Sequence, residues 1–278
     1  MSTAHDPAPR PAAPGQPGGL GFGTAPVFLA GISTILGAIL YLPFGSAVGH
    51  AGLAASLVII LLGHLVTIPT ALAIAEIATN RRVEGGGEYF MISRSFGTTI
   101  GGAIGIALYL SQAISVAFYV IAFAEGFRPL APFFERLTGL AFEPRMVSVP
   151  AIIVLILLIL VRGANLGVKA LWVVASILGV SLVMFFLGSP VDDAGGRSLA
   201  LFDRTPDYDP FFLVFAIVFP AFTGMTAGVG LSGDLANPRR SIPLGTLAAT
   251  VVGMVVYVAI VFKLALSASP AMLASDQL

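Results

Sequence analysis

Residues 219–246 read FPAFTGMTAGVGLSGDLANPRRSIPLGT, and this stretch decides the fold. Up to Gly233 it contains no charged residue, yet Pro220 and Gly224 interrupt its apolar sequence. Inside a bilayer no water satisfies the backbone groups that such helix breakers set free. Irregular backbone therefore survives there only where protein buries it or where it lines a cavity. An apolar span broken near its middle, with Thr223 beside the break, is typical of a transporter's binding site.

The composition of the chain is that of an integral membrane protein. Of the 278 residues, 57% are hydrophobic and 10% are charged, with a mean hydropathy of +0.97. Soluble domains carry roughly 25% charged residues. A formal net charge of +0 does not indicate nucleic-acid binding, and the absence of cysteine excludes disulfides and thiol chemistry. No catalytic or metal-binding constellation is present, so we expect neither an enzyme nor a cofactor.

The uncharged runs predict an all-α protein with seven transmembrane helices, each near the ~20 residues that a crossing helix needs. The predicted spans are 25–49, 52–79, 97–127, 146–162, 168–189, 210–235 and 243–267. Around this transmembrane core (21–267) we expect a disordered tail at 1–20, which is rich in Pro, Ala and Gly, and a polar end at 268–278.

The first span carries the same kind of break as the sixth. Residues 31–45 read GISTILGAILYLPFG, in which Thr34 precedes Gly37 and Pro43. Two interrupted helices five spans apart are what a five-plus-five inverted repeat predicts. The first repeat would cover 25–189 and the second would start at 210. Ten helices are needed for such a fold, so the sequence predicts a chain that ends within the second repeat.

A broken helix presents free carbonyls at the end of its first half and free N–H groups at the start of its second half. The oxygen groups predicted to face a cation belong to Thr34, Ile35, Pro220 and Thr223. The amides predicted to face an anion belong to Gly37, Ala38, Ile39, Gly224, Met225 and Thr226. Such oxygen ligands suit alkali cations and are poor ligands for transition metals. The alternative is that Pro and Gly only kink these helices.

Three segments carry a family resemblance: NRRVEGGGEYFMISRSFG (80–97), ISVAFYVIAFAEGF (114–127) and the opening stretch. From about Gly21 to its end, the chain resembles the cation-chloride cotransporter family. That family belongs to the amino acid-polyamine-cation superfamily, which has the leucine-transporter-type fold. The resemblance implies a potassium site made by the four oxygen-bearing residues and the Tyr119 hydroxyl. Without the resemblance, Tyr119 reads as an interfacial tyrosine.

The same resemblance places one chloride at Gly37–Ile39 and a second anion contact at Gly224–Thr226. Thr34 departs from the asparagine that is common in animal members, although a backbone ligand is insensitive to that change. The family's sodium site needs hydroxyls from an eighth helix, beyond the seven spans. The transported ions that the resemblance implies are potassium and chloride, and sodium coupling stays open because the eighth helix is not part of this sequence.

The resulting hypothesis is a secondary transporter that moves cation and chloride together by alternating access. An amino-acid permease of the same superfamily is the first alternative. Against it, residues 37–39 read Gly-Ala-Ile, where such permeases usually have a second glycine that lets the backbone approach a carboxylate. An inactive fragment, or a membrane subunit that does not transport, is the second alternative.

Charges outside the spans predict the orientation of a multi-pass cell-membrane protein. With the N-terminus in the cytoplasm, eight Lys and Arg residues fall inside and five fall outside. The EGGGE loop (84–88) lacks the Lys and Ser/Thr of a phosphate-binding loop, and we interpret it as a cytoplasmic turn that supports the core. The expected partners are the lipid bilayer and the ions, and a homodimer is compatible with the sequence.

Overall fold

The computed structural model describes residues 21–80, 83, 85–162, 164–190 and 200–275, except for the side chains of 162 and 164–166. Within these residues the chain is all-α, as predicted, and its extended pairing is limited to one bridge between Phe22 and Leu235. The helices in chain order are α1 (Thr24–Ile35), α2 (Ala38–Tyr41), α3 (Phe44–Asn80), α4 (Gly87–Phe96), α5 (Thr98–Glu125), η1 (Arg128–Leu130), α6 (Ala131–Thr138), α7 (Arg145–Arg162), α8 (Ala164–Leu187), α9 (Phe211–Val218), η3 (Phe219–Phe222), η4 (Met225–Asp234), α10 (Pro238–Ser267) and α11 (Pro270–Ser275).

Six helical segments of the described chain are long and apolar enough to cross a membrane. They begin at Thr24, Phe44, Thr98, Gly167, Phe211 and Pro238. The fourth predicted span, 146–162, corresponds to a shorter apolar helix at Arg145–Val161. The all-α membrane fold with interrupted first and sixth spans is therefore confirmed. The predicted tail at 1–20 and the last three residues lie outside the described part of the chain.

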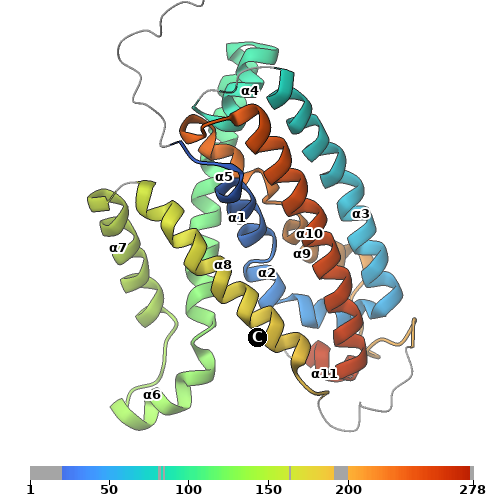
Figure 1. Ribbon diagram of the computed structural model, residues 1–278. Helices are drawn as coiled ribbons and strands as arrows, with labels where there is room; N and C mark the ends of the chain where they lie inside the picture. Colours follow the sequence, from blue (N-terminus) through green and yellow to red (C-terminus); the bar gives the residue numbers. More distant parts are fainter. Residues whose placement is uncertain (1–20, 81–82, 84, 163, 191–199, 276–278) are drawn as a thin grey trace, which may run out of the picture.

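The core lies between α1, α3 and α10, which run side by side along the long axis of the bundle (Figure 1). Small residues on α10 allow α1 to approach closely. A Cβ added to Gly31 of α1 would lie 2.9 Å from Cβ of Ala249, and one added to Gly245 would lie 2.6 Å from Cγ1 of Val27. Because lipid tails are as apolar as leucine, such close van der Waals packing holds membrane helices together. α1 is therefore fixed against α10 along most of its length.

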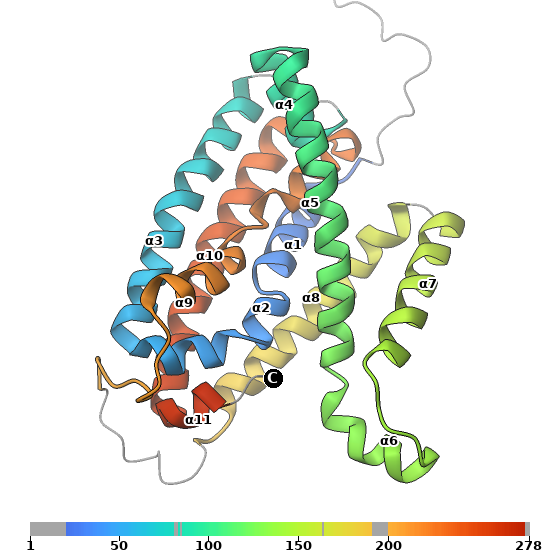
Figure 2. The same ribbon diagram turned by 180° about the vertical axis from the view of Figure 1, so that it is seen from behind.

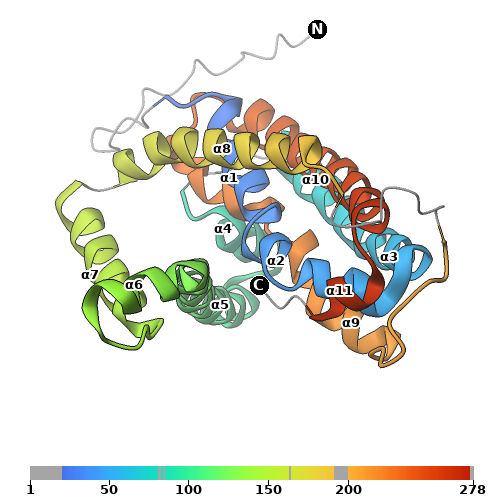
Figure 3. The ribbon, with the colours of Figure 1, turned by 90° about the horizontal axis from the view of Figure 1, so that it is seen from below.

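The helices α6 and α7 stand away from this core (Figure 2). Seen from below, α5 lies with them on one side, and α8 crosses the flank of the core (Figure 3). The apolar side chains of α5, α7 and α8 are mostly exposed, for example Ile114, Leu160 and Val173 at 69%, 76% and 60%. In a membrane these faces contact lipid or other helices.

The boundary between the first and second spans differs from the prediction. Residues 44–49, which we assigned to the first span, form the start of α3, and the chain bends at Gly52 with φ +76°. The loop before α9 fits into this bend, because Ala54 donates its N–H to Leu201 O (2.8 Å) and Thr205 donates to Gly49 O (3.1 Å). This pairing between distant segments leaves no local signal in the sequence.

Candidate functional site

The first break lies where it was predicted, between Thr34 and Ala38. α1 ends at Ile35 and α2 begins at Ala38, so Leu36 and Gly37 join the two helices. The Gly37 N–H donates to Thr34 O at 3.3 Å, and the Thr34 hydroxyl donates back to Ala30 O at 2.8 Å. The backbone hydrogen bonding thus tightens from the α-helical i→i−4 spacing at Leu36 to an i→i−3 turn at Gly37, where α1 stops.

The second break lies at Thr223 and Gly224, between η3 and η4. Thr223 is extended, and Gly224 has φ +93°, a left-handed conformation that glycine adopts without steric cost. Both the N–H and the hydroxyl of Thr223 donate to Pro220 O, at 3.2 and 2.7 Å. The two oxygen-bearing residues predicted in this segment are therefore in direct contact. The second half of the span, η4, is a 3₁₀ helix.

The two breaks meet in space. A Cβ placed on Gly224 would lie 2.5 Å from Cγ2 of Thr34 and 3.0 Å from its Cβ, so the backbone of Gly224 packs directly on Thr34. Further along, Gly228 packs just as closely against the Val27 carbonyl. The structure therefore brings together Thr34 and Gly224, and with Gly224 its neighbour Thr223, from the two predicted ion-binding segments.

Tyr119, the fifth predicted cation ligand, comes from a different helix. It lies on α5 with 42% of its surface exposed, and its ring packs on Phe118 with 5.7 Å between centroids. α5 contacts α2, the short helix that follows the first break. Among the described residues, no hydrogen bond joins Tyr119 to either break. Its role as a ligand stays a prediction.

Tyr257 is a residue of the site that our sequence reasoning missed. It is fully buried (0% exposed), and its hydroxyl donates to the carbonyl of Ile35, a predicted cation ligand, at 2.8 Å. Its ring lies between Phe44 and Phe222, with centroids at 4.9 and 5.2 Å. The only signal in the sequence was a tyrosine within the apolar run MVVYVAIV of the seventh predicted span.

The EGGGE loop contacts the interrupted helix, as the interpretation of a supporting turn predicts. The Gly87 N–H donates to Oγ of Ser232 at 3.2 Å, and a Cβ on Gly87 would lie 3.2 Å from Val229 O. The Glu88 carboxylate, on α4 and outside the membrane spans, accepts a hydrogen bond from the side chain of Thr226. An anion at Thr226 would therefore meet a carboxylate.

Burial raises the pKa of Glu88, and the hydrogen bond from Thr226 offsets only part of that rise. A raised pKa means that the folded protein binds this proton more tightly than the unfolded chain does. The ionised carboxylate therefore destabilises the fold above the raised pKa, and this effect disappears as the pH falls through it.

We expect Glu88→Gln to raise the melting temperature of the detergent-solubilised protein at about pH 7, because the amide keeps an acceptor for Thr226 without the buried charge. The gain should vanish near pH 4, where Glu88 itself becomes neutral. Glu76→Gln, at an exposed carboxylate on α3, is the matched control and should change little. A lower melting temperature for Glu88→Gln at neutral pH would show that the fold requires the ionised form.

The predicted anion-facing amides lie at the starts of two short helical segments. α2 has only 4 residues, so its dipole is small. What it offers is the pair of N–H groups at its first two positions, Ala38 and Ile39, which no preceding turn can satisfy. In η4 the N–H of Ala227 already donates to Gly224 O at 3.0 Å. Free amides, rather than a helix dipole, are thus the chemistry available to an anion.

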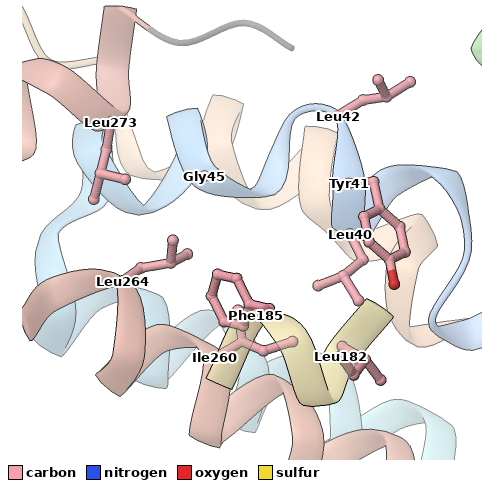
Figure 4. Close-up of a pocket in the computed structure, with 9 residues that line it drawn as sticks. All are labelled: Leu40, Tyr41, Leu42, Gly45, Leu182, Phe185, Ile260, Leu264 and Leu273. Carbon is pink, nitrogen blue, oxygen red and sulfur yellow. The ribbon is translucent and has the colours of Figure 1, made fainter. Parts of the chain in front are cut away.

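An apolar cavity of about 220 Å³ lies beside α2, lined chiefly by Leu40 and Tyr41 with side chains of α8 and α10 (Figure 4). Figure 4 shows Phe185 and Ile260 facing into the same space. Apart from the Tyr41 hydroxyl, its side chains carry no polar atom, so it does not suit an inorganic ion. No cluster of three metal-ligating side chains occurs among the described residues.

The chain is similar in sequence to a known family and to several known proteins. The family described as "Amino acid permease" matches residues 27–276. Solute carrier family 12 member 2 of Squalus acanthias is 37% identical over 235 residues, which is 80% of this chain and 20% of that protein. The human protein of the same name is 37% identical over 238 residues, covering 81% and 20%. Solute carrier family 12 member 1 of Oryctolagus cuniculus is 35% identical over 242 residues, covering 81% and 22%.

The chain spans about a fifth of the length of these curated relatives. The matched part of the chain contains both breaks, Tyr119 and Tyr257. The resemblance drawn from the sequence motifs is therefore confirmed. The chain belongs to the amino acid permease family, within which it is a member of the cation-chloride cotransporters that solute carrier family 12 represents.

Proposed function

We propose that the protein is a secondary transporter that moves potassium and chloride together by alternating access. The observation that carries this proposal is the contact between the two breaks, with Gly224 packed on Thr34. Two interrupted helices that meet at one depth supply oxygen ligands for a cation next to free amides for an anion. In this proposal the cation contacts Thr34, Ile35, Pro220, Thr223 and Tyr119. The anions contact the amides of Gly37, Ala38 and Ile39 and of Gly224, Met225 and Thr226.

Pairing the ions has a physical reason. A single charge at the middle of a bilayer is costly, whereas adjacent opposite charges offset each other's loss of hydration. The Glu88 carboxylate beside Thr226 disfavours the second anion position. The first anion position, at Ala38 and Ile39, therefore supports the paired arrangement best.

Removing single oxygen ligands tests the cation site. We expect Thr223→Ala and Tyr119→Phe each to reduce chloride-dependent rubidium uptake about tenfold at low rubidium, since one lost ligand costs roughly 1.4 kcal/mol. Uptake would be measured in cells that express the protein, with and without chloride and sodium.

The chain offers a matched control for each substitution. Thr70→Ala removes an exposed hydroxyl that bonds only to Val66 O within α3. Tyr109→Phe removes one from a tyrosine on α5 that is 73% exposed. Both controls should retain wild-type uptake. Wild-type uptake in Thr223→Ala and Tyr119→Phe as well would refute the assignment of the cation ligands.

An amino-acid permease is the second candidate, and the family match itself favours it. Ile39 opposes it, because its side chain stands where close approach of a substrate carboxylate would need a glycine. Uptake measurements distinguish the two candidates. A cotransporter takes up rubidium only with chloride, and amino acids do not inhibit this uptake. A permease takes up amino acids and does not require chloride.

The proposed transporter has its N-terminus in the cytoplasm, as the distribution of Lys and Arg predicts. This orientation places α4 and the EGGGE loop on the cytoplasmic side. The exposed apolar faces of α5, α7 and α8 would contact lipid or further protein, including a second copy in a homodimer. The chain has no native cysteine, so Tyr89→Cys introduces a single one. Whether a membrane-impermeant thiol reagent labels it from inside or from outside the cell tests the orientation directly.

A further inference from the structure

We propose that Tyr257 is a positioning residue that sets the carbonyl of Ile35 for cation selection. The inference rests on the proposed cation site and adds a residue of α10 to it. Tyr257 reaches the first break from the enclosed side of the bundle, where α10 runs alongside α1 (Figure 1). Its hydroxyl donates to Ile35 O at 2.8 Å.

Ile35 is held by α10 at two points. A Cβ added to Gly253 would lie 2.7 Å from Cγ2 of Ile35, so the absence of a side chain at Gly253 makes room for Ile35. One turn later on the same helix, Tyr257 binds the carbonyl. The side chain and the carbonyl of Ile35 are thus both fixed by a single helix.

The Ile35 carbonyl needs such a partner because α1 ends there. The last carbonyls of a helix have no N–H donor within the helix. A carbonyl that is left without any donor is costly in an apolar core. A carbonyl oxygen has two lone pairs, so the hydroxyl of Tyr257 takes one and leaves the other for a cation. With one lone pair fixed, the direction of the second is fixed too.

The Tyr257 hydroxyl is itself held in place. The ring is 0% exposed and packs between Phe44 and Phe222, and Phe222 directly precedes Thr223 of the second break. Tyr257 therefore contacts both breaks: its hydroxyl binds the Ile35 carbonyl of the first, and its ring packs on Phe222, the neighbour of Thr223 in the second. The size of the cage that the oxygen ligands form is one factor that distinguishes cations of different radius.

The test replaces Tyr257 by phenylalanine, which keeps the ring packing and removes only the hydroxyl. We expect the KM for rubidium or potassium to rise about tenfold with little change in maximal uptake. We also expect the preference for potassium over caesium to weaken and the KM for chloride to stay within twofold. A purely structural role would instead lower the amount of folded protein and leave both KM values unchanged.

Thr250→Val is the matched control, since it removes a buried hydroxyl on the same helix that bonds only to Thr246 O. It should leave both KM values at the wild-type level. Gly253→Ala is a second variant that pushes on Ile35 while keeping the Tyr257 hydroxyl, and it should also raise the cation KM. It decides the question if Tyr257→Phe does not fold.

The outcomes separate this inference from the transport proposal. If the wild-type protein shows no chloride-dependent rubidium uptake, the proposed function fails. If the wild type transports and folded Tyr257→Phe has the wild-type cation KM and selectivity, the positioning role alone is overturned. Loss of the fold in both Tyr257→Phe and Gly253→Ala would also overturn it, because the two residues would then be structural.

Discussion

Replacing Gly224 by alanine is expected to abolish uptake and to lower the free energy of unfolding by about 2 to 5 kcal/mol. Two effects combine at this position. At φ +93° a side chain suffers the strain of the left-handed region, and the new Cβ would lie 2.5 Å from Cγ2 of Thr34. Since both breaks meet here, the collision would push Thr34 and Thr223 apart.

The steric part of this effect can be separated from the backbone strain. Thr34→Ser removes Cγ2 but keeps the hydroxyl that donates to Ala30 O. The double variant Thr34→Ser/Gly224→Ala should therefore recover part, but not all, of the lost stability, which a double-mutant cycle measures. Gly230→Ala is the matched control in η4, because a Cβ there meets nothing within 4 Å. If Gly230→Ala is as damaging as Gly224→Ala, contact between the breaks is not the cause.

The positions of both breaks could be predicted because their signal is local. Pro220, Gly224 and Gly37 interrupt apolar runs at a depth where free backbone groups must be satisfied by protein. The family motifs added Tyr119, which no local pattern singles out. In the structure the interruptions fall at Leu36–Gly37 and at Thr223–Gly224, within the predicted segments.

The partners of the breaks could not be predicted, because they come from distant parts of the chain. Nothing near Ile35 in the sequence indicates that its carbonyl accepts a bond from Tyr257. Likewise, Glu88 reaches Thr226 only because α4 packs on η4. Hydrophobic periodicity reports which face of a helix is buried, but it does not report which side chain lies opposite.

The local conformation of the chain after each break could not be predicted from the sequence either. The predicted spans continue past their breaks to 49 and to 235, but α2 has 4 residues and η4 is a 3₁₀ helix of 10 residues. Glycines at 224, 228, 230 and 233 lower the preference of this segment for the α-helix. At Gly228 close approach to the Val27 carbonyl fixes the path of the chain instead.

Phe222→Ala is expected to cost about 3 kcal/mol of unfolding free energy, the lower end of the range for a buried phenylalanine. The lower end applies because a membrane protein loses packing contacts but little hydrophobic transfer energy. Phe222 is 1% exposed, packs on Gly63 of α3, and places its ring 5.1 Å from that of His64 and 5.2 Å from that of Tyr257. The ring therefore joins α3 and α10 to the second break.

We expect Phe222→Ala to reduce rubidium uptake more strongly than it reduces the melting temperature, because Phe222 adjoins Thr223 and packs on the ring of Tyr257. We expect the cation KM of Phe222→Leu, which fills part of the space, to lie between those of the wild type and Phe222→Ala. Phe212→Ala is the control in α9, with a side chain that is 79% exposed and little packing to lose. Thermal unfolding in detergent and rubidium uptake measure the two effects separately. If Phe222→Ala lowers the melting temperature but leaves the cation KM unchanged, Phe222 holds the helices together without positioning the site.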